Sequence, residues 1–171
     1  MRKLLLTASV AGAIAPAAQG AGLDVSVEIP RLDVAEYHRP YVAIWIENAD
    51  QSVAADLAVW YDVAKKENEG TEWLKDLRQW WRRSGRGQQF PVDGVSGATK
   101  PAGTHAVRLE EGAGALAGLK PGNYALVVEA AREVGGRELV RVPFQWPAQK
   151  AERLAARGEH ELGAVELNIV P

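Results

Sequence analysis

The chain has 171 residues, a formal net charge of −2 and no cysteine. The absence of thiols excludes zinc ribbons, c-type haem attachment, iron–sulfur clusters and cysteine nucleophiles. Because 20 Lys and Arg residues are balanced by 22 Asp and Glu residues, the composition argues against a protein that binds nucleic acid or an anionic membrane surface.

The N-terminal segment is typical of a secretion signal. Arg2 and Lys3 form a positive start, and the run from Leu4 to Ala15 is almost wholly apolar. This run is too short to cross about 30 Å of hydrocarbon, which favours a cleaved signal peptide over residues 1–20 rather than a membrane span. We therefore expect residues 21–171 to be a single domain, exported to the periplasm without insertion into the membrane.

Most of the remaining segments alternate between apolar and polar residues, which predicts β-strands. Turn residues separate 41–47 from 56–62 and 124–133 from 138–146, so each of these pairs is expected to form a hairpin. The seven predicted strands cover residues 23–29, 41–47, 56–62, 104–109, 124–133, 138–146 and 164–170. Seven short strands joined by tight turns predict a mainly β fold, an antiparallel immunoglobulin-like β-sandwich.

Two segments have a helical pattern instead. Between residues 71 and 83 the apolar side chains recur at the spacing of one helix face, and Gly85 suits the end of that helix. The helix would be an insertion between strands, leading into a loop over residues 91–103. The helix-favouring sequence from Ala148 to Arg157 predicts a second, short helix.

The predicted loop holds the most specific motif of the chain. Residues 93–100 read Asp-Gly-Val-Ser-Gly-Ala-Thr-Lys. This segment resembles the Asp-x-x-Ser-Gly-Ala-Thr pattern on which bacterial flavin transferases attach FMN to a threonine hydroxyl through a phosphoester bond. The resemblance implies a covalent FMN on Thr99. The candidate cofactor-binding residues are Asp93, Ser96, Gly97, Ala98, Thr99 and Lys100.

The motif residues suit such an attachment chemically. Thr99 supplies the nucleophilic oxygen, while Gly97 and Ala98 leave room for the transferase, and Gly97 permits backbone angles closed to other residues. Asp93 and Ser96 can hydrogen-bond the backbone of their own loop and set its shape. An ordinary turn with an unmodified threonine is the open alternative, because Asp, Gly and Ser are also common turn residues.

Residues around the motif allow two interpretations each. Lys100 and the three arginines between residues 82 and 86 either neutralise a phosphate or stay solvated near a helix end. Trp80 or Trp81 either stacks on a flavin ring or packs the helix on the sheet. His105, at the start of a predicted strand, lies near the motif in sequence but has no metal-ligand spacing.

Longer segments resemble a family. The segments that carry the resemblance are the strand Pro-Tyr-Val-Ala-Ile-Trp at residues 40–45, residues 57–60, Trp73-Leu74 with Trp80, residues 93–105, residues 121–124 and residues 129–133. They are similar to predicted periplasmic proteins known as domain of unknown function 2271. The resemblance covers nearly all of the chain beyond the signal. It implies an extracytoplasmic bacterial β-sandwich, often encoded near flavin transferases and membrane redox proteins, and it implies no established activity.

Two functions remain in view. In the first, the protein is a periplasmic flavinylated protein of extracytoplasmic electron transfer; a flavin transferase modifies Thr99, and a membrane redox protein is a candidate partner. In the second, it is a non-enzymatic periplasmic binding or scaffold module without a cofactor. Neither assigns a catalytic residue or a metal ligand to this chain, so a role as electron carrier or binding module is favoured over an enzyme.

Overall fold

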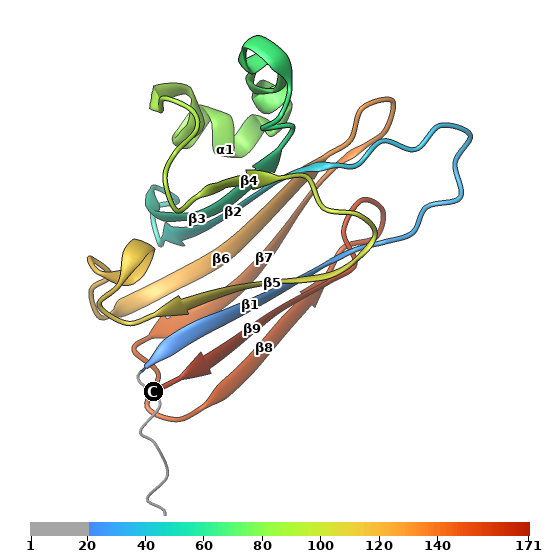
Figure 1. Ribbon diagram of the computed structural model, residues 1–171. Coiled ribbons are helices and arrows are strands. Elements are labelled where there is room, and N and C mark those ends of the chain that lie inside the picture. Colours follow the sequence, from blue (N-terminus) through green and yellow to red (C-terminus); the bar gives the residue numbers. More distant parts are fainter. Residues whose placement is uncertain (1–20) are drawn as a thin grey trace, which may run out of the picture.

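The computed structural model describes residues 21–171, which form nine strands in two open sheets (Figure 1). The strands are β1 (Gly22–Ile29), β2 (Tyr41–Asn48), β3 (Val53–Tyr61), β4 (Ser96–Ala98), β5 (Gly103–Glu110), β6 (Gly122–Ala131), β7 (Arg137–Trp146), β8 (Glu152–Arg157) and β9 (Ala164–Val170). The order is β5-β1-β9-β8 in one sheet and β4-β3-β2-β6-β7 in the other. The fold is mainly β, as predicted; the predicted signal peptide lies outside the described residues.

All seven predicted strands are present within a few residues of their expected ends. Both predicted hairpins are confirmed, because β2 pairs with β3 and β6 pairs with β7, each in the antiparallel sense. The two strands that were not predicted are β4 and β8.

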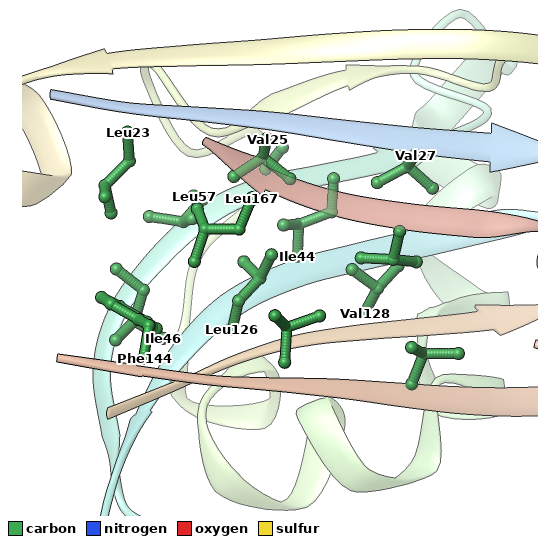
Figure 2. Close-up of a cluster of buried hydrophobic side chains, with 14 of the residues drawn as sticks. Leu23, Val25, Val27, Ile44, Ile46, Leu57, Leu126, Val128, Phe144 and Leu167 are labelled. Carbon is green, nitrogen blue, oxygen red and sulfur yellow. The ribbon is translucent and has the colours of Figure 1, made fainter. Parts of the chain in front are cut away.

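The two sheets face each other across an apolar core, into which side chains from both sheets point (Figure 2). Period-two alternation explains this directly: Leu23, Val25 and Val27 of β1 are at most 1% exposed, whereas the residues between them are only half-buried. Leu126 and Val128 of β6 approach them from the opposite sheet. Burial of these alternate side chains supplies the main stabilisation of the fold.

A second apolar cluster covers the outer face of the five-stranded sheet. Strand β2 is buried on both faces, since Ile44 belongs to the core while Trp45 packs outward beneath the helical insertion. The insertion contributes Leu74, Leu77 and Trp80, all fully buried. Three layers result: a sheet, a second sheet, and a helical cover (Figure 1).

The predicted single helix over residues 71–83 is divided in two. The first part is the 3₁₀ helix η1 (Lys66–Asp76) and the second is α1 (Arg78–Arg83), followed by the short η2 (Gly85–Gly87). At Leu77 the backbone leaves the helical region with ψ 68°, so the ladder of hydrogen bonds is interrupted there. The Glu129 carboxylate of β6 accepts the backbone N–H of Gln79 and of Trp80, in the first turn of α1. An anion from the sheet therefore stabilises the N-terminus of this second helix.

The predicted helix over Ala148–Arg157 is wrong: residues 152–157 form strand β8 at the edge of the four-stranded sheet. The strand pairs with β9, and its side chains alternate between half-buried and exposed. Leu154 and Ala156 pack against the core, while Arg153, Ala155 and Arg157 are exposed. Tertiary pairing therefore overrides a local helix preference worth only tenths of a kcal/mol per residue.

A short 3₁₀ turn, η3 (Gly114–Leu116), closes the link between β5 and β6. Within residues 21–171, every helix is too short or too polar to cross a bilayer.

Candidate functional site

The motif begins with a self-closed turn. The backbone N–H groups of Val95 and Ser96 both donate to the Val92 carbonyl, at 3.2 and 2.9 Å, and the Ser96 hydroxyl accepts the Val92 N–H at 2.9 Å. Gly94 has φ +70°, which favours glycine, and Asp93 is exposed at the turn. Ser96 thus bonds the backbone of its own loop as expected, whereas the Asp93 side chain forms no hydrogen bond within residues 21–171.

The motif then becomes an edge strand. Strand β4 runs parallel to β3, with Trp60 opposite Gly97 and Tyr61 opposite Ala98. The Thr99 N–H donates to the Tyr61 carbonyl at 3.2 Å. The segment over residues 91–103 is thus a turn and a strand rather than a loop throughout. Ala98 is exposed, whereas Thr99 is half-buried, so the candidate acceptor is held at a fixed place on the sheet edge.

Beyond the turn at residues 92–96, the motif packs against Trp60. A Cβ added at Gly97 would stand 3.4 Å from Trp60 Cδ1, an ordinary contact, and Gly97 is not among the glycines with positive φ. The Lys100 ammonium lies 5.6 Å from the centroid of the Trp60 ring, and the His105 ring lies 5.9 Å from it. His105 Nε2 is 2.7 Å from the Pro101 carbonyl oxygen. Lys100 and His105 therefore both lie beside the motif.

Thr99 lines a cleft of about 540 Å³. The cleft lies at the end of the five-stranded sheet where β2 begins and β3 and β6 end. The segment between β1 and β2 and the turn between β6 and β7 both reach this end of the molecule (Figure 1). The lining residues are Tyr37, His38, Arg39, Tyr41, Asp62, Lys65, Trp73, Asp76, Thr99, Ala131, Arg132, Glu133 and Val134. Its volume falls within the roughly 300–1,000 Å³ typical of small-molecule sites.

Exposed apolar side chains gather at this cleft. Of the five large hydrophobic residues that are exposed in the described chain, three line it: Tyr37 at 39%, Trp73 at 46% and Val134 at 74%. Val134 also has φ +52°, a conformation that strains a β-branched residue. Backbone strain of this kind persists where surrounding structure imposes it, and it concentrates at functional sites.

Arg132 is the most deeply buried cation at the cleft. Its side chain is 6% exposed and forms a bidentate pair with Glu161, at 2.8 and 3.0 Å. Glu161 also accepts the Gly136 N–H at 2.8 Å. The remaining guanidinium nitrogen, Nη1, is buried and has no hydrogen-bond partner within the described chain. Because Nη1 is closed off from solvent, a ligand in the cleft could satisfy this donor only after the Arg132 side chain shifts.

Two glycines give the Arg132–Glu161 pair its space. A Cβ added at Gly135 would stand 2.6 Å from Arg132 Nη2, and one added at Gly136 would stand 2.9 Å from Glu161 Oε1. From the sequence these glycines indicate a hairpin turn, and they do occupy one. Their close approach to the ion pair is a further role that a turn pattern cannot show.

The cleft carries both signs of charge. Arg39 and Lys65 are exposed at its rim, and His38 lies 3.5 Å from Glu133. Burial raises the pKa of Tyr41 to about 12, and the carboxylates of Asp62 and Glu133 add to this rise against an opposing backbone hydrogen bond at Asp62. The Tyr41 hydroxyl is therefore neutral at physiological pH.

One of the three arginines between residues 82 and 86, Arg83, lies elsewhere. Arg83 pairs with buried Glu47, toward the end of β2 opposite to Tyr41. At about 3.3 Å per residue the two β2 residues are about 20 Å apart, so Arg83 does not flank Thr99. Trp80 is fully buried and donates its indole N–H to Asp56 at 2.8 Å, which confirms the packing interpretation for that residue. Trp73, rather than Trp80 or Trp81, is the insertion's tryptophan at the cleft.

Comparison with known proteins bears on all of this region. A family model described as "Predicted periplasmic protein (DUF2271)" matches residues 22–164. The chain belongs to this family. The DUF2271 match runs from β1 to the first residue of β9 and includes both the motif and the cleft. No curated protein and no solved structure gives a significant match. The family description agrees with the export expected from the first twenty residues.

Three carboxylates that the sequence analysis did not single out hold the insertion of this DUF2271 domain on its sheet. Asp56 of β3 accepts from Trp80 Nε1, from the Ser84 hydroxyl and from Gln88. Glu47 and Glu129, on β2 and β6, are 1% and 0% exposed. An acidic residue within an otherwise apolar strand was the available signal, because a buried charge needs partners from another element.

Proposed function

We propose that this DUF2271 protein is an exported flavoprotein that carries FMN esterified to Thr99 and takes part in periplasmic electron transfer. The observation that carries the proposal is the position of Thr99. It ends a flavin-transferase-type motif and lines a cleft of about 540 Å³ that has an aromatic wall and a buried unpartnered donor. A threonine in a simple surface turn would need none of these surroundings.

The residues at the cleft fit the chemistry of the cofactor. Trp73 and Tyr37 offer exposed aromatic rings to a planar heterocycle. Exposed Arg39 and Lys65 at the rim offer positive charge to a phosphodiester. Lys100 follows Thr99 in the chain but lies over the Trp60 ring and does not line the cleft. When bound, FMN supplies the redox chemistry, and the protein supplies position and electrostatics.

The attachment is a transfer of the FMN half of FAD to the protein. A bond forms between Thr99 Oγ1 and the phosphorus that carries riboflavin, the pyrophosphate link to AMP breaks, and the hydroxyl proton passes to a base of the flavin transferase. The products are the phosphoester and AMP, with no change of oxidation state. In this proposal Asp93, Ser96, Gly97 and Ala98 shape the edge strand and serve recognition by the transferase.

We also propose an immunoglobulin-like fold, a cleaved export signal and a membrane redox partner for this protein. The facing sheets with their shared core support an immunoglobulin-like β-sandwich, and the family description supports cleavage of a signal within residues 1–20 and a periplasmic location. A membrane redox protein is the proposed exchange partner for electrons. The protein itself performs no catalysis in this scheme.

A second candidate is a periplasmic binding module with an unmodified Thr99. The cleft favours it independently, because loops at one end of a β-framework commonly carry recognition sites. In that case the cleft would take a free ligand, and no flavin would remain after denaturation.

Intact mass separates the two. The protein is exported from a bacterium that expresses a flavin transferase, as wild type, as Thr99→Ala, and as Thr104→Ala, which alters an exposed threonine of β5. We expect a gain equal to FMN less one water in the wild type and in Thr104→Ala, and none in Thr99→Ala. An unmodified wild type in cells that flavinylate another protein would overturn the proposal.

A further inference from the structure

We infer that the cleft beside Thr99 is the binding site of the isoalloxazine ring, with Trp73 and Tyr37 as its aromatic wall, and that a shift of the Arg132 side chain lets its buried Nη1 donate to the ring. This inference rests on the proposed flavinylation of Thr99, and it goes further because attachment alone requires only the hydroxyl. A flavin tethered at this position could otherwise extend into solvent.

The aromatic wall supports a docked ring. Trp73 is 46% exposed although it belongs to a helical cover whose neighbours Leu74 and Leu77 are fully buried. Tyr37 comes from the segment before β2, so two chain segments far apart in sequence place rings at one cleft. The Lys75 ammonium lies 5.9 Å from the centroid of the Trp73 ring. Trp73 nevertheless shares its cleft with exposed Tyr37 and Val134, and a gathering of exposed apolar side chains, rather than a single one, marks a ligand site.

Arg132 supports the polar half of the site. The Glu161 carboxylate balances the positive charge of the Arg132 guanidinium. Arg132 would therefore contribute a hydrogen-bond donor to a ligand rather than a net charge. Gly135 and Gly136 let the pair sit against the turn, and the same turn places strained Val134 on the cleft. The β6–β7 turn thus supplies both an apolar and a polar group.

Flavin fluorescence tests the aromatic wall. A stacked indole quenches flavin emission by electron transfer, so Trp73→Ala should raise the emission per attached flavin severalfold and increase its quenching by iodide, with the flavin content measured by intact mass. Val63→Ala is the matched control, because Val63 is 40% exposed but does not line the cleft. Equal emission and iodide access in wild type and Trp73→Ala would overturn the inference while leaving Thr99 flavinylation intact.

The midpoint potential tests Arg132. Arg132→Lys keeps a cation near Glu161 but removes the Nη1 donor, so we expect a lower flavin midpoint potential, because a donor to the ring stabilises its electron-rich reduced form. Circular dichroism verifies that the variant is folded. If a folded, flavinylated Arg132→Lys protein has the wild-type potential, Arg132 does not contact the ring. Absence of the mass gain in the wild type, by contrast, refutes flavinylation itself.

Discussion

The backbone N–H of Thr99 donates to the carbonyl oxygen of Tyr61 at 3.2 Å, directly beyond the parallel pairing of β4 with β3. Tyr61 is buried beneath the insertion, and its ring lies 6.2 Å from that of Tyr41 and 6.0 Å from that of Phe90. Tyr41 in turn lines the cleft. The residue whose carbonyl holds the Thr99 backbone therefore also belongs, through its ring, to the aromatic cluster that packs the insertion on the sheet.

Gly97→Ala separates folding from recognition. Because an added Cβ makes only an ordinary contact with Trp60, and Gly97 does not need a positive φ, we expect the free energy of unfolding to change by less than about 0.5 kcal/mol. We also expect flavin attachment to fall, since the transferase would meet a larger residue beside Thr99. Urea unfolding and intact mass measure the two effects. A variant that is unfolded, or one labelled like wild type, contradicts the proposed role of Gly97.

Glu129→Ala should detach the insertion. Glu129 is fully buried, accepts the N–H groups of Gln79 and Trp80, and pairs with Arg137 at 2.7 Å. Its loss leaves buried donors without partners, and we expect a cost of about 3 kcal/mol in unfolding free energy.

Glu166→Ala is the control for this change, because its partner Arg153 is 69% exposed. A surface pair of this kind contributes at most about 1 kcal/mol. Urea unfolding of both variants gives the comparison. Equal losses would mean that Glu129 does not anchor the insertion.

Gly135→Ala tests the space beside Arg132. The new Cβ would stand 2.6 Å from Arg132 Nη2, so the ion pair or the turn must move, and we expect a loss of about 1–3 kcal/mol. Gly118→Ala is the matched control: nothing lies within 4 Å of its Cβ, and its stability should change by less than about 0.5 kcal/mol. Thermal unfolding distinguishes them, and identical midpoints for the two variants would count against close packing at Gly135.

Glu138 should make stability depend on acid pH. Burial alone would raise the pKa of its carboxyl, but N–H groups from residues 159–162 donate to it, at 2.6–3.1 Å, and hold the pKa below the ordinary value of a glutamate side chain. Because the folded-state pKa lies below the unfolded value, this stabilisation is present above about pH 4.5 and is lost as the pH falls through the folded pKa.

The measurement is urea unfolding of wild type and Glu138→Gln across the acid range. We expect the wild type to be more stable at pH 7 and the difference to shrink below about pH 4.5. A difference that stays constant down to pH 3 would show that ionisation of Glu138 contributes nothing.

The sequence by itself determined the strands with a clear period-two pattern and the two hairpins. Alternation and turn chemistry are local properties, and strands such as β1 carry them in consecutive residues. The same locality explains why Ser96 was correctly expected to bond its own loop. It also explains the failure at residues 148–157, where Ala-rich composition predicts a helix but pairing with β9 decides for a strand.

Only the tertiary structure decided what surrounds Thr99. The cleft joins Tyr37, Trp73 and Arg132, which come from three segments separated by more than thirty residues each. The buried anchors Glu47 and Glu129 likewise act on residues of another element. Contacts of this range depend on how the layers pack, and no periodicity within a single segment encodes them. The motif identifies Thr99 as the candidate attachment site from the sequence, but only the fold brings an aromatic wall and a buried donor to the cleft that Thr99 lines.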